Sequence, residues 1–131
     1  MTPPTWFTQA LAQQPEHRDV VVAGSRVHYR AWGPIGAPGV VLVHGGAAHS
    51  GWWDHIAPQL VASQPTGHRV VALDLTGHGD SDHRTDYDPL VWAREVVAVA
   101  AATGLDRPVV IGHSMGGWVA VTAGVEHPAE V

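Results

Sequence analysis

One serine in this sequence has the neighbours that are typical of a catalytic nucleophile. Ser114 stands in a Gly-x-Ser-x-Gly pattern, residues 112–116, between the β-branched run 109–111 and small, apolar residues of helical type. A sharp strand-to-helix turn in this context lifts a serine hydroxyl out of the fold. The turn strains the serine backbone, so its neighbours must be small, as Gly112 and Gly116 are. We therefore expect a serine that attacks a carbonyl carbon.

Attack on a carbonyl creates a negatively charged oxygen, which must be stabilised by fixed N–H donors. The N–H of Met115 directly follows the nucleophile, and a helix that begins there turns its unpaired N–H groups and positive dipole end toward the site. The second donor is expected from Gly46 or Ala47, in the loop after the apolar run 40–43, where glycine lets the backbone approach a substrate closely. We expect Met115 and Gly46 to form an oxyanion hole.

A hydroxyl becomes a good nucleophile only when a base removes its proton, and the sequence contains no obvious base. His127 lies at the far end of the predicted helix 114–126, roughly 20 Å from Ser114 at 1.5 Å per residue. We expect it to interact with the helix dipole instead. Cysteine is absent, so the chain has no thiolate nucleophile.

Other histidines lie closer to the serine in the predicted arrangement. The side chain of His113 should point away across the turn, and His44 should belong to the architecture of its own loop. His49 and His78 lie on loops that we expect to rim the pocket, and either could approach Ser114. The geometry between base and nucleophile is exacting, so a base from within this chain is the less favoured alternative.

We predict no metal site and no cofactor. A loop set could be drawn from His44, His49, Asp54 and His55, but no helical His-Glu-x-x-His pattern occurs. Acidic residues at 80, 82, 86 and 88 resemble a calcium loop only superficially, because its glycine and closing glutamate are missing. We interpret them as solvated loop acids, with Asp88 as a helix cap.

The elements that must position these residues alternate along the chain. Apolar periodicity and turn residues predict strands at 19–23, 26–32, 40–43, 69–73 and 108–111, and helices at 5–14, 52–62, 90–103 and 114–126. A hairpin at Gly24-Ser25 is followed by strand–helix units, which build a mostly parallel sheet with helices on both faces. Ligands collect beyond the carboxyl ends of such strands, where both glycine-rich loops and Ser114 lie.

Composition narrows the possible partners to small molecules. The formal charge of −5, with no lysine and seven scattered arginines, argues against nucleic acid or an anionic membrane as a partner. No apolar run is long enough to span a membrane, and residues 1–5 lack the features of a signal peptide. We expect a cytoplasmic protein with a small-molecule substrate. The six tryptophans are expected in the core and the pocket wall.

Three motifs together resemble the first half of an α/β-hydrolase-fold enzyme. Residues 43–46 (VHGG), 73–81 (LDLTGHGDS) and 112–117 (GHSMGG) match, in order and spacing, the family's third strand, fourth strand and nucleophile turn. The resemblance implies Ser114 as nucleophile and Met115 and Gly46 as oxyanion donors. It also implies a substrate site lined by His44, Gly45, Ala47 and His113, bordered by a loop at 74–82 that does no chemistry. We divide the chain into an N-terminal helical extension, 1–17, and a partial hydrolase core, 18–131.

The chain departs from this family after the nucleophile. In the family the acid and the histidine follow the nucleophile in that order, but only thirteen residues follow Trp118 here. The later strands, the lid and both triad partners have no room, and the strand 109–111 should lack a neighbour on one side. An open apolar edge of this kind favours self-association or a complementing C-terminal half.

Two functions remain open from the sequence. The first is a serine hydrolase, apparently truncated, that acts on an ester or related carbonyl compound. The same turn occurs in haloperoxidase-like, lipase-like and carbon–carbon-bond hydrolases, whereas relatives with an acidic nucleophile are disfavoured because residue 114 is serine. The alternative is a catalytically inactive remnant, or a binding module, that retains half the fold.

Overall fold

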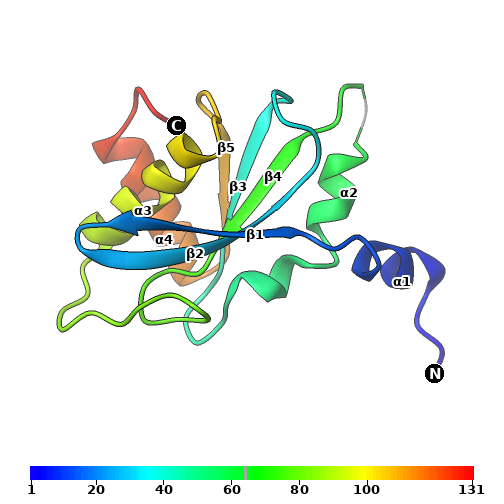
Figure 1. Ribbon diagram of the computed structural model, residues 1–131, viewed down its shortest axis with the longest axis horizontal. Helices are drawn as coiled ribbons and strands as arrows, with labels where there is room; N and C mark the ends of the chain where they lie inside the picture. The colour runs from blue at the N-terminus through cyan, green and yellow to red at the C-terminus, as the bar shows by residue number, and fades with distance from the viewer. Residues whose placement is uncertain (64) are drawn as a thin grey trace.

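The computed structural model, which describes residues 1–63 and 65–131, is organised around a five-stranded sheet (Figure 1). The strand order is β1-β2-β4-β3-β5. The strands are β1 (Glu16–Val22), β2 (Ser25–Trp32), β3 (Gly39–Val43), β4 (Arg69–Leu73) and β5 (Val109–Gly112). The sheet is mixed: β3, β4 and β5 are parallel, while β2 runs antiparallel to both β1 and β4.

Helices cover both faces of this sheet, as the sequence predicts for an α/β fold. They are α1 (Thr5–Leu11), the 3₁₀ helix η1 (Ser50–Trp53), α2 (Ala57–Val61), α3 (Pro89–Ala102) and α4 (Met115–Glu126). Helix α2 lies on one side of the central strands, and α3 and α4 lie on the other (Figure 1). The carboxyl ends of β3, β4 and β5 therefore meet at one edge, where their loops form the candidate site.

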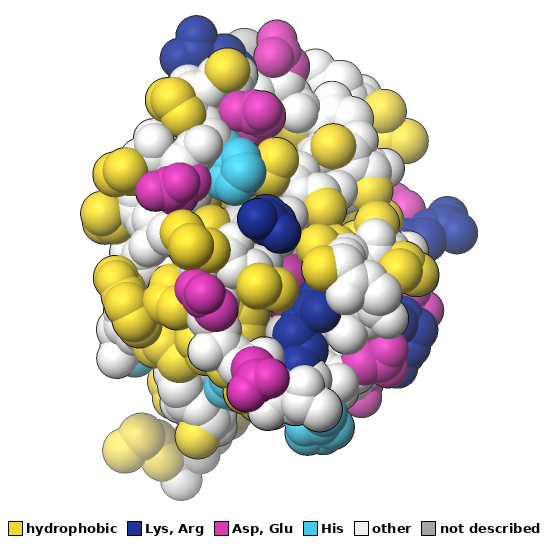
Figure 2. Space-filling model, turned by 90° about the vertical axis from the view of Figure 1, so that its left-hand side faces the viewer, with side chains coloured by type: hydrophobic (Ala, Val, Ile, Leu, Met, Phe, Trp, Pro, Cys, Tyr) yellow, Lys and Arg dark blue, Asp and Glu magenta, His cyan; other side chains and the backbone are white. Residues whose placement is uncertain are grey.

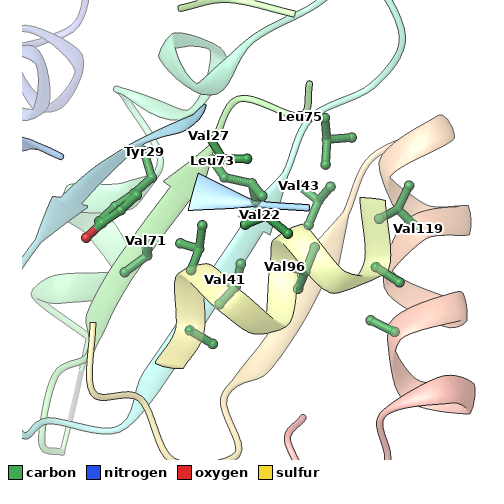
Figure 3. Packing of buried hydrophobic residues seen from close by; sticks show 14 of the residues in the cluster. Val22, Val27, Tyr29, Val41, Val43, Val71, Leu73, Leu75, Val96 and Val119 are labelled. Atoms are coloured by element: carbon green, nitrogen blue, oxygen red, sulfur yellow. The ribbon is translucent and has the colours of Figure 1, made fainter. Parts of the chain in front are cut away.

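The central strands are apolar on both faces because both faces are covered. In β3, Val41 and Val43 pack toward α3 and α4 (Figure 3), whereas Val40 and Leu42 pack toward α2. The same alternation continues in β4. Successive side chains of such a strand face opposite sides of the sheet, and both sides are covered by helices. No side chain of the strand therefore faces water, which explains why its hydrophobic run is uninterrupted.

The predicted helix 52–62 is wrong as a single element. The segment contains η1, a turn and the short helix α2. Pro58 lies in the first turn of α2, where its missing N–H breaks no helical hydrogen bond. The N-terminal helix also ends at Leu11 rather than at residue 14, and β1 begins at Glu16, where it pairs with Ala31.

The long helix α3 begins and ends within one residue of the predicted range 90–103. The Asp88 side chain accepts a hydrogen bond from the Leu90 N–H at 2.8 Å and so caps the first turn. Gly104, with φ +69°, follows the last turn, and the Leu105 N–H returns to the Ala100 carbonyl at 2.9 Å.

One edge of the molecule is apolar and exposed. Strand β5 pairs only with β3 among the described strands, and its Val109 side chain is 62% exposed. Helix α4 exposes Val121 and Val125 beside it. On the side of the molecule seen in Figure 2, many hydrophobic side chains gather along one margin, and charged side chains are interspersed over the rest of the face. Within the described residues, no helix combines the length and apolar character required to cross a bilayer.

Candidate active site

Ser114 lies at the sharp turn between β5 and α4, and its side chain is exposed. Its φ of 53° and ψ of −119° are a conformation that L-residues adopt rarely. The need for small neighbours is confirmed. A Cβ on Gly112 would lie 2.1 Å from the Gly116 carbonyl oxygen, and a Cβ on Gly116 would lie 2.3 Å from that of Val43. The two glycines let the turn close against the end of β3.

The loop after β3 lies directly against this turn. A Cβ on Gly45 would lie 3.4 Å from that of Ser114, and one on Gly46 would lie 3.8 Å from the Met115 sulfur. The N–H groups of Gly46 and Met115 find no acceptor among the described residues. Two backbone donors without an internal acceptor therefore lie in the two segments that meet at the serine.

The His44 side chain is buried beneath the loop after β3 and stabilises it, so it does not line the open surface of the site. Its ring is fully buried, accepts the Leu75 N–H at Nε2 (3.1 Å), and donates from Nδ1 to the Gly45 carbonyl (2.7 Å). This second bond fixes the peptide plane that also carries the Gly46 N–H. Burial lowers the pKa of His44 and outweighs the opposing effect of the Gly45 carbonyl, so the ring remains neutral.

The other residues expected around the substrate occupy different positions. Gly45 is buried under the turn, while Ala47, with φ +56°, and His113 are exposed. The His113 ring stacks on Trp52, with ring centroids 6.4 Å apart. His49 accepts the Gly51 N–H at 3.1 Å and so caps η1. No histidine in the described part of the chain is hydrogen bonded to Ser114.

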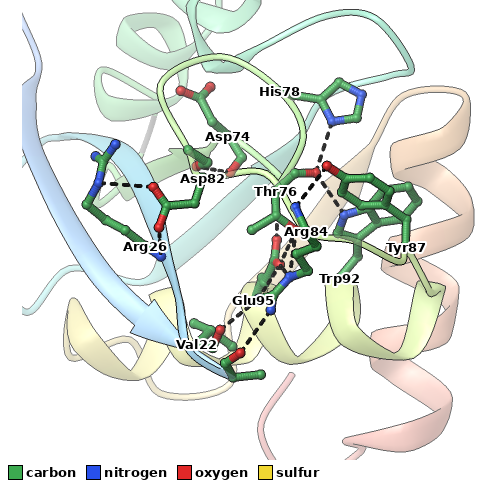
Figure 4. A network of polar contacts seen from close by, with 12 residues as sticks. Val22, Arg26, Asp74, Thr76, His78, Asp82, Arg84, Tyr87, Trp92 and Glu95 are labelled. Atoms are coloured by element: carbon green, nitrogen blue, oxygen red, sulfur yellow. Dashed lines mark hydrogen bonds and ion pairs between the residues drawn. The ribbon is translucent and has the colours of Figure 1, made fainter.

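A buried carboxylate that sequence reasoning missed organises the neighbouring loop. Asp74 accepts the Ser50 N–H at 2.6 Å and the Asp80 N–H at 3.0 Å. Burial opposes ionisation of Asp74, but these donors outweigh it and hold its pKa below the ordinary value. In the sequence, its position directly after a buried strand was the feature that could have indicated this structural role. Asp82 is expected to be a solvated loop acid, and in the structure its carboxylate accepts the Arg26 N–H at 2.7 Å (Figure 4).

Metal ligation has one geometric candidate among the described residues, formed by His28, Asp74 and Asp80. The His28 nitrogens already contact Asp19 (2.9 Å) and His17 (3.1 Å), and both Asp74 oxygens accept backbone N–H groups. These ligand atoms are therefore occupied by internal hydrogen bonds. The sequence also offered His44, His49, Asp54 and His55 as possible metal ligands. Of these, Asp54 forms a salt bridge with Arg30 at 2.9 Å.

A hollow of about 460 Å³ opens beside the serine turn. It is lined by Gly77, His78, His83, Tyr87, Trp92 and Met115. Trp92 is thus a pocket-wall tryptophan, as predicted for this residue type. Three others are not: Trp6, Trp52 and Trp118 are each about half exposed. A smaller hollow of about 200 Å³ lies at the opposite end of β5, around Leu105 and Arg107.

Sequence comparison finds hydrolases among the similar proteins. The profile of the alpha/beta hydrolase fold family matches residues 38–131. A monoacylglycerol lipase of Mycolicibacterium smegmatis is 38% identical over 123 residues, covering 88% of this chain and 43% of the lipase. A non-heme chloroperoxidase of Streptomyces lividans is 38% identical over 95 residues, covering 72% of this chain and 33% of that protein. The chain thus spans less than half the length of either relative.

Solved structures show the same architecture. The crystal structure of epoxide hydrolase A from Mycobacterium thermoresistibile superposes with a TM-score of 0.82 at 30% identity. The match covers 90% of this chain and 37% of that one. The five-stranded sheet and its helices therefore correspond to part of a larger fold in that enzyme.

Proposed function

Because this chain belongs to the α/β-hydrolase fold family, we propose that it is a serine hydrolase acting on an ester or related carbonyl substrate. The observation that carries the proposal is the conformation of Ser114, held at φ 53° and exposed between two unpaired backbone donors. The names of the similar proteins indicate several substrate classes. A serine at position 114 favours attack on a carbonyl over chemistry that begins with a carboxylate nucleophile.

The proposed reaction uses this chain for attack and for charge stabilisation. The Ser114 oxygen bonds to the carbonyl carbon while its proton passes to a base, and the carbonyl π electrons move to oxygen. The N–H groups of Gly46 and Met115 stabilise this oxyanion. When the tetrahedral intermediate collapses, the bond to the alcohol breaks and the base returns the proton to it. Water then releases the acid from Ser114 by the same route.

The base is proposed to lie outside residues 1–131, in the part of the fold that the longer relatives have beyond the matched region or in a complementing polypeptide. No described histidine is hydrogen bonded to Ser114, and the matched relatives are more than twice as long as the matched region. The same observation favours the alternative function, a binding module whose serine is not activated. An experiment that supplies the base chemically separates the two.

Labelling with a fluorophosphonate probe tests the proposal. We expect slow labelling of the chain at Ser114, with the rate increased by added imidazole, a small general base that can reach an exposed hydroxyl. Ser114→Ala should abolish labelling under both conditions. Ser25→Ala, which removes a hydroxyl remote in sequence from the site, serves as the matched control and should label like the parent.

Absence of labelling in a folded chain would contradict the proposal. If neither the chain alone nor the chain with imidazole labels above Ser114→Ala, while circular dichroism shows the fold intact, the serine is inert and the binding module is favoured. Peptide mapping of the labelled chain identifies the modified residue directly.

A further inference from the structure

The hollow beside Ser114 has aromatic walls contributed by three elements. His78, His83 and Tyr87 come from the loop between β4 and α3, Trp92 from the start of α3, and Met115 from the first residue of α4. The ring centroids of Tyr87 and Trp92 are 5.7 Å apart and those of His78 and Trp92 are 6.1 Å apart. Met115 directly follows Ser114, so the hollow lies next to the turn that carries the serine.

Hydrogen bonds fix these walls before any ligand binds. The Trp92 Nε1–H donates to the Thr76 carbonyl at 3.2 Å, and the Tyr87 hydroxyl accepts the Arg84 N–H at 3.1 Å (Figure 4). Gly77, at φ +86°, lets the Tyr87 ring lie over the backbone, because a Cβ there would be 2.7 Å from that ring. Preformed walls reduce the entropy lost on binding.

The lining carries no carboxylate, ammonium or guanidinium group. The nearby Arg84 directs its guanidinium elsewhere: it donates to the Val22 carbonyl at 2.7 Å and pairs with Glu95 at 3.1 Å. Asp88 is engaged as the α3 cap. An anionic ligand would therefore lose hydration without gaining a fixed cationic partner, whereas a neutral ring would gain stacking contacts. Attraction of a cation to the faces of Tyr87 and Trp92 is the alternative that the binding test must separate from this one.

We propose that this hollow binds a neutral aromatic group of the substrate, next to the carbonyl that Ser114 attacks. The inference rests on the proposed hydrolase function for its role in turnover, but binding can be measured separately. A volume of about 460 Å³ lies within the range of small-molecule pockets and accommodates an aryl ring with its linker. The aromatic group is the part of the substrate that would set specificity.

The test uses amides that are poor substrates, so that binding is separated from turnover. N-benzylacetamide is compared with N-(cyclohexylmethyl)acetamide, its saturated counterpart, and with the cation benzyltrimethylammonium, by NMR titration of the 131-residue chain. We expect the benzyl amide to bind roughly 2- to 10-fold more tightly than the cyclohexyl amide, the effect of one good aromatic contact. The cation should bind more weakly than the neutral amide.

Variants assign the effect to the hollow. Trp92→Leu should remove the aryl preference, and Tyr87→Leu, at a 43% exposed position that tolerates substitution, should reduce it in the same direction. Trp118→Leu is the matched control, since Trp118 is 58% exposed and lies outside the hollow. Its aryl preference should equal that of the parent. Circular dichroism confirms that each variant is folded.

Three outcomes would overturn the inference: equal binding of the two amides, tighter binding of the cation, or an equal loss of aryl preference in Trp118→Leu and Tyr87→Leu. Ser114→Ala separates this inference from the proposed function. If the chain binds the benzyl amide preferentially but the fluorophosphonate probe never labels Ser114, only the hydrolase proposal is contradicted. Labelling at Ser114 without any aryl preference contradicts only the aromatic site.

Discussion

Thr76 donates two hydrogen bonds to the fully buried carboxylate of Glu95, from its hydroxyl at 2.6 Å and from its N–H at 2.9 Å. Arg84 completes the site with bonds at 3.1 and 3.2 Å to the same carboxylate. This network (Figure 4) ties the loop between β4 and α3 to α3 and to the hairpin of β1 and β2. It therefore sets the shape of the aromatic hollow.

Breaking this buried ion pair should destabilise the fold strongly. Arg84→Met leaves the Glu95 charge without its cation in the interior, so we expect a loss of about 3 kcal/mol in the free energy of unfolding, measured with urea. The double variant with Glu95→Met should lose less than the sum of the single variants. Arg26→Met is the control, because its pairs are about half exposed and worth less than about 1 kcal/mol. Equal losses in Arg84→Met and Arg26→Met would contradict this account.

The parts of the fold that could be predicted are those specified locally. The runs 40–43 and 70–73 are apolar at every position, and the turn at Ser114 is specified by the glycines on either side of it. Each feature depends on residues close together in sequence. The prediction of one helix over 52–62 was wrong because Pro58 favours a helix that starts near it rather than one that contains it.

Contacts between distant segments could not be predicted in the same way. Glu95 lies within a predicted helix, and nothing near it in sequence indicates a partner at Arg84 or Thr76. Asp74 likewise binds Ser50, 24 residues away. Such pairings depend on how loops cross at the edge of the sheet, which periodicity does not report. The set of residues that lines the aromatic hollow comes from three elements and could not be predicted for the same reason, although His78 was expected at the rim of a pocket and tryptophan in its wall.

The strained backbone at Ser114 predicts an unusual effect of glycine. Ser114→Gly should be more stable than Ser114→Ala by about 1 kcal/mol, because glycine adopts φ 53° without strain while alanine does not. Thermal unfolding should show a difference of roughly 3 to 5 °C. Ala101→Gly, at an exposed position in the last turn of α3, is the control and should destabilise. If Ser114→Ala is as stable as Ser114→Gly, the backbone of the turn is not strained.

The buried ring of His44 predicts a loss of stability in mild acid. Its pKa is lowered from 6.5 by burial, so below pH 6.5 the unfolded chain takes up a proton that the folded ring does not. The free energy of unfolding should therefore fall as the pH drops from 6.5 toward the folded pKa. The carboxylates with lowered pKa values, such as Asp74 and Glu16, reduce stability mainly below about pH 5, as the pH approaches and passes their ordinary pKa values of 3.8 and 4.5. Urea midpoints at pH 7, 6 and 5 measure the slope.

The variant His44→Gln isolates this ring from the other histidines. It should be less stable than the parent at pH 7, because the amide cannot reproduce both ring hydrogen bonds, but its stability should change less between pH 7 and 5. His127→Gln is the control and should keep the slope of the parent. If both variants retain that slope, protonation of His44 does not limit stability in acid.

The apolar edge formed by β5 and α4 predicts self-association of the isolated chain. Val109, Val121 and Val125 are each more than 60% exposed, and β5 has one side without a partner strand among the described residues. We expect a concentration-dependent increase in sedimentation coefficient. Val121→Glu with Val125→Lys places opposite charges one helical turn apart, which keeps α4 helical while making the surface polar. This pair should shift the chain toward the monomer, whereas Ile35→Glu, at an 83% exposed loop position, should not. A parent chain that sediments as a monomer at all concentrations and unfolds in one sharp thermal transition would contradict the proposal that this edge needs a partner.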